Sequence, residues 1–475
     1  MCLNVFHTKS KPTILLFLIY NLAISCGMPK AEQQASSDNN FEKPMHLSIP
    51  DTLNAGVLYQ KVAINEDELN TFTLYLPKLY NKSTLWPVVF FFDPGGKGFL
   101  PVQKYQLLAD SLGYIFIGSN VSKNGQDIDE SLTMWNALKN SCLNNLSIDK
   151  NRIILAGFSG GARVSCAIAS KEPSVACIIA NSAGAQQLDQ LLNQNTLFIG
   201  LAGNGDMNRA EMLGIEQNLM SSSIVHYYME FDGNHAWAPF KIMQKAIMIA
   251  SLNANEKNPN ELNAVLTENF ISNQKKEIDK LKLEGKWLEA YQELILLTKG
   301  AKGLNTSLTD QLDSIKNNPN YIVQKNELLK LTTQETEIQQ ELYKMMLENQ
   351  NLTIWKTRIA QIRKNSFQKN KIGQMNQRLL GYASLVCYSL SNRNLVAKNY
   401  PLAEIMVNSY KIADPENPEV YFFKAILSGA KSDSLNTYLN LNKSIELGFI
   451  DKKRITIQSE FNFLKDDPVF NKILN

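Results

Sequence analysis

The sequence predicts an α/β fold with a mostly parallel sheet and helices on both faces, followed by an all-α region. Short β-branched or aromatic runs alternate with helix-like stretches from about residue 55 to residue 231. A leading pair of such runs is separated by a polar turn, which indicates an antiparallel hairpin. Alternation of strand and helix after it favours a parallel sheet. After about residue 255 the strand patterns stop, and helical periodicity continues to residue 475.

The N-terminal segment predicts export. Lys9 and Lys11 precede the apolar run Thr13–Ile24, which is too short to span a bilayer comfortably. A basic start, a short apolar run and small residues are typical of a secretory signal, here residues 1–25. Its end resembles the lipobox of bacterial lipoproteins, although alanine stands where leucine is usual: Leu22-Ala23-Ile24-Ser25-Cys26.

The lipobox resemblance implies that Cys26 is lipidated; the alternative is an ordinary signal peptide cut nearby. Residues 26–44 are polar and predict a flexible tether. We therefore expect an exported, lipid-anchored protein that lies against a membrane, on the periplasmic, outer-membrane or cell-surface side of a bacterial envelope.

Residues 45–254 predict the α/β domain. Its hairpin strands are Val57–Ile64 and Phe72–Leu76, and Trp86–Phe92 is a continuous apolar run typical of a strand buried on both faces. Tyr114–Ser119 predicts the next strand and Ile128–Asn144 a helix. The remaining strands are expected at Arg152–Ala156, Ala176–Ala180, Thr196–Ala202 and Ile224–Phe231, with a helix through Ala169 after the first of them.

The composition excludes several classes of protein. The chain is 44% hydrophobic and 20% charged, which is too apolar for a disordered chain and too charged for a multi-span membrane protein. A net charge of only +3 argues against nucleic acid as a partner. The six cysteines form no CxxC pair, so the sequence indicates no metal cluster.

The nucleophile is predicted at Ser159. It lies in Gly157-Phe158-Ser159-Gly160-Gly161, between a predicted strand and a predicted helix. A Gly-x-Ser-x-Gly match is weak alone, but this context is the one that a nucleophile elbow requires. The N–H of Gly160, at the start of the helix, is expected to stabilise a developing oxyanion.

The general base is predicted by elimination among four histidines. His7 lies in the signal, His46 is expected upstream of the sheet, and His226 falls inside a predicted strand. His235 follows the last strand, in the loop Asp232-Gly233-Asn234-His235-Ala236-Trp237, where the base of an elbow-type hydrolase lies.

The acid that orients the base is predicted at Asp206. It follows a strand in a glycine-rich loop between the nucleophile and the histidine, in the chain order Ser, Asp, His. Asp232 is the competing carboxylate, but it is close in sequence to His235. The other role open to Asp206 is a helix N-cap.

A second oxyanion donor is expected in the loop Asp93-Pro94-Gly95-Gly96. Proline has no N–H, so Pro94 is excluded. Gly95 is the first choice and Gly96 the second.

With these motifs in place, residues 55–250 resemble α/β-hydrolases of the esterase, feruloyl-esterase and polyhydroxybutyrate-depolymerase-like group. The resemblance lies in the Gly-Phe-Ser-Gly-Gly elbow and the Gly-Asn-His-Ala-Trp loop. The chain departs from that group in the oxyanion loop, where Asp93-Pro94 replaces the common His-Gly. The resemblance implies a serine hydrolase that forms an acyl-enzyme and needs no cofactor.

The expected substrate is a carboxylic ester, either an acylated carbohydrate or a related small ester, free or at a polymer end. The stretch Ala180–Asn195 leaves little room for a lipase-type lid, so we expect an open site, where Trp237 either stacks on substrate or faces the core. Two alternatives remain: a serine peptidase or amidase on the same triad, and a non-enzymatic surface binding protein with a relic hydrolase domain.

Residues 255–475 predict an α-helical region. Glu284–Tyr291 resembles the turn and second helix of a tetratricopeptide unit, and the helix ends near Asp414 and Gly448 are about 34 residues apart, as in such repeats. Solenoids of this kind present concave surfaces, so a protein partner is one expectation for this region, and a spacer or internal brace is another.

Overall fold

The computed structural model describes residues 45–46, 53–65, 67–185, 187–193, 195–255, 262–300, 306–349 and 351–474. The predicted signal, the tether and Cys26 lie outside the described residues. Within the described part, no helix is both long and apolar enough to cross a membrane.

A nine-stranded sheet, in the order β1-β2-β3-β5-β4-β6-β7-β8-β9, forms the centre of the first domain. The hairpin of β2 and β3 is antiparallel, as predicted, and β3 also pairs antiparallel with β5. From β5 to β9 in the sheet order, neighbouring strands run parallel. The two-residue β1 pairs with β2, so His46 lies in the sheet and not upstream of it. The strands are β1 Met45–His46, β2 Leu58–Ile64, β3 Asp67–Tyr75, β4 Trp86–Phe92, β5 Ile115–Ser119, β6 Ile148–Phe158, β7 Val175–Asn181, β8 Leu197–Gly203 and β9 His226–Phe231.

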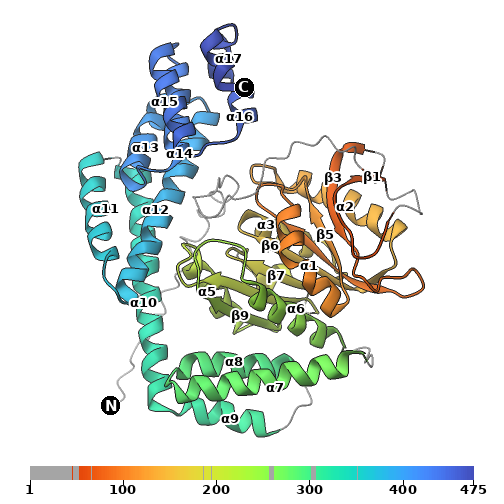
Figure 1. Ribbon diagram of the computed structural model, residues 1–475. Helices are drawn as coiled ribbons and strands as arrows, with labels where there is room; N and C mark the ends of the chain where they lie inside the picture. The colour runs from red at the N-terminus through yellow and green to blue at the C-terminus, as the bar shows by residue number, and fades with distance from the viewer. Residues whose placement is uncertain are drawn as a thin grey trace, which may run out of the picture.

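Helices cover both faces of this sheet (Figure 1). The side chains of Val88 and Phe90 in β4 pack with one core and those of Val89 and Phe91 with the other, because successive strand residues point to opposite faces. Buried residues of α2 (Ile128–Asn145), α3 (Gly160–Ala169) and α5 (Arg209–Leu219) join the first core. Those of α1 (Phe99–Leu112) and α6 (Phe240–Asn255) join the second. Burial on both faces explains the continuous apolar run of β4.

The chain after α6 is helical throughout its described residues. Its α-helices are α7 Leu262–Leu283, α8 Trp287–Gly300, α9 Thr306–Lys316, α10 Pro319–Lys344, α11 Leu352–Ser366, α12 Lys371–Val396, α13 Tyr400–Ala413, α14 Pro418–Gly429, α15 Ser434–Glu446, α16 Lys452–Ile457 and α17 Pro468–Leu474. The predicted architecture, a mostly parallel sheet with helices on both faces followed by an all-helical region, is confirmed. The domain limits and the tetratricopeptide likeness stay predictions.

The helical region lies against the sheet domain at α8 and along α10. Leu296 of α8 lies in the core that α1 and α6 form with the sheet, and Lys245 of α6 pairs with Glu293 of α8 at 2.8 Å. The long α10 then passes along the side of the domain, and α11 to α17 continue beyond it (Figure 1). The helices from α10 onward share a core of their own.

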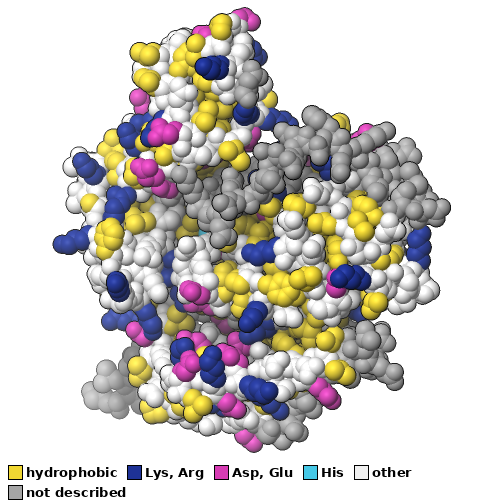
Figure 2. Space-filling model, viewed as in Figure 1, with side chains coloured by type: hydrophobic (Ala, Val, Ile, Leu, Met, Phe, Trp, Pro, Cys, Tyr) yellow, Lys and Arg dark blue, Asp and Glu magenta, His cyan; other side chains and the backbone are white. Residues whose placement is uncertain are grey.

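Charges of both signs are mixed on the surface. On the face shown in Figure 2, Lys and Arg side chains are interspersed with Asp and Glu. This distribution agrees with the small net charge of +3.

Candidate active site

Ser159 stands on a strained turn between β6 and α3. Its φ of 52° and ψ of −120° lie outside the ordinary regions for a residue with a side chain, as in a nucleophile elbow. The turn is tight enough to need glycine on both sides: a Cβ on Gly157 would overlap the carbonyl of Gly161, and a Cβ on Gly161 would overlap that of Phe92. The Ser159 N–H donates to the Asn181 carbonyl at 2.8 Å, which ties the turn to β7.

The structure brings the three predicted triad residues together. His235 Nε2 lies 2.9 Å from Ser159 Oγ, and His235 Nδ1 lies 2.9 Å from Asp206 Oδ1. Asp206 is fully buried and the Ser159 residue is 6% exposed. The ring of Phe158 packs on the imidazole with a centroid separation of 4.8 Å. An Nδ1–H directed at the carboxylate leaves Nε2 as the acceptor for the serine hydroxyl.

Asn208, and not Asp206, is the N-cap of α5, while the carboxylate of Asp206 faces the predicted base. Asp206 Oδ1 also accepts the N–H of Asn208 at 2.8 Å, just before α5 begins. The competing Asp232 is exposed, and its Oδ1 accepts a hydrogen bond from Asn204 at 3.1 Å. His226, the other histidine of this region, is buried in β9 with Nδ1 2.8 Å from the Ile224 carbonyl.

The N–H groups of the two candidate oxyanion donors, Gly95 and Gly96, both have partners in the structure. The N–H of Gly95 donates to Asp93 Oδ1 at 2.9 Å, and the N–H of Gly96 donates to the Asp93 carbonyl at 3.0 Å. Both glycine donors are therefore engaged within their own loop. For Gly95 the reason is the buried carboxylate of Asp93, which must find donors once it is removed from water.

Gly160, the other predicted oxyanion donor, lies directly after Ser159 in the turn. It is the first residue of α3, where an N–H has no partner inside the helix. The side-chain amide of Asn124 lies against it, because a Cβ on Gly160 would overlap Asn124 Oδ1. Asn124 belongs to the loop after β5, and no sequence motif pointed to it.

Trp237 is a core residue and does not offer its ring to a substrate. Its indole Nε1–H donates to Asp93 Oδ2 at 3.0 Å, and its ring packs near those of Phe91, Tyr105 and Phe158. Burial raises the pKa of Asp93, and the hydrogen bonds from Trp237 and Gly95 partly oppose that rise. The Asp93–Trp237 bond joins the loop after β4 to the loop that carries His235.

Asn181 is a further residue that the sequence did not reveal. Its side chain is fully buried at the end of β7. Its Nδ2 donates to the Ala236 carbonyl at 3.2 Å, and its Oδ1 accepts the Ala238 N–H at 2.7 Å, on either side of Trp237. Because its backbone carbonyl also accepts from Ser159, Asn181 holds both the nucleophile and the base loop.

The described residues hold no group of three or more His, Cys, Asp or Glu placed to bind a metal ion. The four cysteines among them are buried and unpaired with one another: Cys142, Cys166, Cys177 and Cys387.

No protein-family model and no curated protein matches this chain. Among solved structures, the chain is similar to esterase B from Lactobacillus rhamnosis at 12% identity, over 44% of this chain and 90% of that one, with a TM-score of 0.36. It is similar to S-formylglutathione hydrolase from Staphylococcus aureus at 15% identity, over 42% and 95%, with a TM-score of 0.33. A match to Pyrococcus horikoshii acylaminoacyl peptidase has 14% identity and a TM-score of 0.30, and covers 38% of this chain and only 38% of that one.

Proposed function

We propose that this protein is a serine hydrolase that cleaves a carboxylic ester through an acyl-enzyme. One observation carries the proposal: Ser159 Oγ, the His235 imidazole and Asp206 Oδ1 form a continuous chain of two 2.9 Å contacts. A serine hydroxyl is a weak nucleophile until a base within hydrogen-bond reach removes its proton. The strained backbone of Ser159 adds to this support, because such strain is common at catalytic turns.

The geometry supports the following sequence of steps. His235 Nε2 takes the proton from Ser159 Oγ as the oxygen bonds to the acyl carbon. The carbonyl electron pair moves to oxygen, where the Gly160 N–H at the start of α3 stabilises the negative charge. His235 then gives its proton to the departing alcohol oxygen as the ester bond breaks. A water molecule then attacks the acyl carbon as one of its protons passes to Nε2. The bond between the acyl carbon and Oγ breaks, the proton on Nε2 passes to Oγ, and the acid is released with Ser159 restored.

Asp206 keeps the imidazole in the tautomer that this sequence needs. Its buried carboxylate accepts a hydrogen bond from the Nδ1–H of His235 and stabilises the imidazolium that forms in each half-reaction. The second Oδ1 contact, from the Asn208 N–H, holds the carboxylate in place at the start of α5.

We propose an acylated carbohydrate or a related small ester, free or at a polymer end, as the substrate class. The short connection between β7 and β8 supports this proposal, since it gives little chain for a lid over the nucleophile. We also propose that Cys26 carries a lipid that attaches the exported protein to a membrane. Replacing Cys26 with serine should then release the protein from the membrane fraction and abolish incorporation of labelled fatty acid.

The deciding experiment is labelling with a fluorophosphonate probe, followed by hydrolysis of short-chain nitrophenyl esters. The wild type should react with the probe and turn over the ester, and Ser159→Ala should do neither. Ser170→Ala, at the far end of α3, is the matched control and should label normally. A wild type that neither labels nor hydrolyses would refute the proposal and leave the binding-protein alternative. Faster turnover of a peptide panel than of the ester panel would replace the ester by an amide.

A further inference from the structure

The loop that carries Asp206 is held by the helical region. Arg378 of α12 donates from Nη1 to the Asn204 carbonyl at 2.7 Å, and Gln339 of α10 donates from Nε2 to the Met207 carbonyl at 3.3 Å. These two carbonyls lie on either side of Asp206. The donors are 174 and 132 residues away along the chain.

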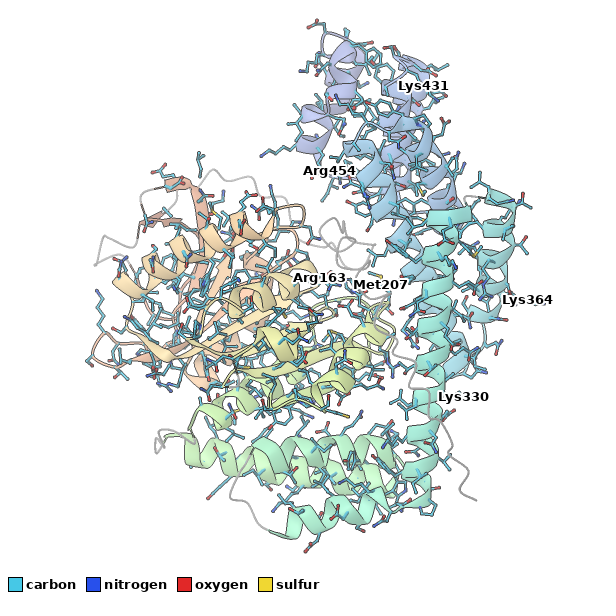
Figure 3. All side chains as sticks on the ribbon, turned by 180° about the vertical axis from the view of Figure 1, so that it is seen from behind. Arg163, Met207, Lys330, Lys364, Lys431 and Arg454 are labelled. Atoms are coloured by element: carbon cyan, nitrogen blue, oxygen red, sulfur yellow. The ribbon has the colours of Figure 1, made fainter. Side chains whose placement is uncertain are left out.

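Met207 anchors the same loop by its side chain. It is 6% exposed and belongs to the core of the helical region, not to either core of the sheet domain. A Cβ added to Gly381 of α12 would stand 3.3 Å from Met207 Cβ and 3.5 Å from its Sδ. Figure 3 shows Met207 where the sheet domain meets these helices. The residue directly after the proposed catalytic acid is thus packed by α12.

Arg378 is itself rigidly held. Its Nε donates to Glu335 Oε1 at 2.8 Å and its Nη2 to Oε2 at 2.6 Å, so the pair is bidentate and links α10 to α12. The side chains are 5% and 0% exposed. A guanidinium fixed on two sides has a defined direction for its third donor, which is the one that reaches Asn204.

The other two triad residues are held from within the sheet domain. Asn181 of β7 binds the backbone on both sides of Trp237, and Tyr105 of α1 donates to the Ala238 carbonyl at 2.6 Å. The acid loop differs, because its outer side rests on helices that follow the sheet domain in sequence.

We infer that the helical region is part of the catalytic apparatus, and that Arg378, Gln339 and Met207 are positioning residues that act through Asp206. The inference rests on the proposed function. The helical region then has a role beyond binding a partner or acting as a spacer. It sets the position of the Asp206 carboxylate, which orients His235. A displacement of about 1 Å in a catalytic group can cost about 100-fold in rate, so the contact needs to shift the loop only slightly to be measurable.

The first test replaces both members of the Arg378–Glu335 ion pair in the full-length chain. In Glu335→Met with Arg378→Met, no buried charge is left alone, and such exchanges are often neutral or stabilising for the fold. The Asn204 carbonyl nevertheless loses its donor. We expect kcat on a nitrophenyl ester to fall about 10- to 100-fold, with KM unchanged, because binding is not what the loop supplies.

The matched control is a second bidentate pair in the helical region, Arg454 with Glu419, at 2.6 and 2.9 Å. Figure 3 shows Arg454 well away from Met207. Glu419→Met with Arg454→Met should keep the wild-type kcat. If both double variants keep it, or both lose it equally, the inference is overturned.

A second test adds a methyl group where α12 meets the loop. Gly381→Ala should push Met207 by a few tenths of an ångström and lower kcat about threefold or more. It should unfold at no lower urea concentration than the wild type, because alanine is the better helix former. Gly214→Ala in α5, where a Cβ would meet nothing within 4 Å, is the control and should leave kcat unchanged. This pair decides the inference even if the double variant does not fold, and an unchanged kcat in Gly381→Ala would refute it.

A spectroscopic readout separates this inference from the proposed function. The His235 Nδ1 proton, shared with Asp206, should resonate far downfield, and both perturbing variants should shift or broaden that resonance while both controls leave it in place. If the wild type has no hydrolase activity, the proposed function fails, and the resonance still tests whether the helices position Asp206. If the wild type is active but neither kcat nor the resonance responds, only the inference fails.

Discussion

Replacing Asn181 with alanine tests whether one buried amide holds two parts of the active site. The side chain makes three hydrogen bonds: to the Ala236 carbonyl at 3.2 Å, from the Ala238 N–H at 2.7 Å, and to Ser182 Oγ at 2.6 Å. At about 1 kcal/mol for each, the free energy of unfolding should fall by about 3 kcal/mol. The partners are buried and cannot be fully rescued by water, so the loss should not be smaller than this sum suggests.

The same change should slow the reaction. Freed from Asn181, the loop of His235 is expected to shift relative to Ser159, and kcat should fall about 10- to 100-fold. Urea unfolding gives the stability, provided that the slope with denaturant is unchanged, and ester hydrolysis gives kcat. The kcat measurement belongs at a temperature where the variant is fully folded.

The control is Asn417→Ala, which removes a buried amide from the N-cap of α14. Asn417 accepts the Glu419 N–H at 3.1 Å and donates to Asp414 at 2.9 Å, so its loss should cost about 1 to 2 kcal/mol. It should leave kcat unchanged. The reasoning is refuted if Asn181→Ala keeps the wild-type kcat and stability, or if both variants lose kcat to the same degree.

Three further predictions concern the same site. Asp206→Asn should lower kcat by about 10⁴, because an amide favours the wrong tautomer of His235; Asp232→Asn should not, and equal losses would reverse the choice of acid. Trp237→Phe should lower the free energy of unfolding by about 1 to 3 kcal/mol, because the Asp93 carboxylate loses a hydrogen-bond donor, and KM should be unchanged. A raised KM would mean that the indole contacts substrate. Burial raises the pKa of Asp93 above its ordinary value of 3.8. The folded state therefore favours the protonated carboxyl, which stabilises the fold at pH values below 3.8. That stabilisation is lost as the pH rises through the folded-state pKa. Urea unfolding across this range should therefore show Asp93→Asn gaining on the wild type with rising pH, and the opposite trend would contradict the assignment.

Local patterns in the sequence predicted the fold of the first domain. The apolar run of Trp86–Phe92 predicted a strand with two buried faces, and β4 packs into both cores. The turn between β2 and β3 was likewise visible as a polar break, and the hairpin is antiparallel as predicted. Such features depend on residues that are neighbours along the chain, so no knowledge of distant contacts is needed to read them.

The candidate site could likewise be predicted from the sequence only in part. Ser159 was marked by its elbow and His235 by the scarcity of histidines, and the structure brings both to Asp206. Gly95 was chosen because a glycine follows a strand, but its N–H is taken by Asp93. That outcome depends on a buried carboxylate that also accepts a hydrogen bond from Trp237, more than 140 residues away.

By itself, the sequence determined the strands from β2 onward, the order of the elements and the candidate residues at the strand ends. Short local patterns of apolar, glycine and polar residues are enough to predict these features. Only the tertiary structure decided how the loops are held. Asn181 fastens the loop of His235, and Arg378 fastens the loop of Asp206 from a helix 174 residues away from the carbonyl that it binds. Such contacts have no local signature, since a buried amide or guanidinium takes its partners from whatever backbone the packing of distant elements brings within reach.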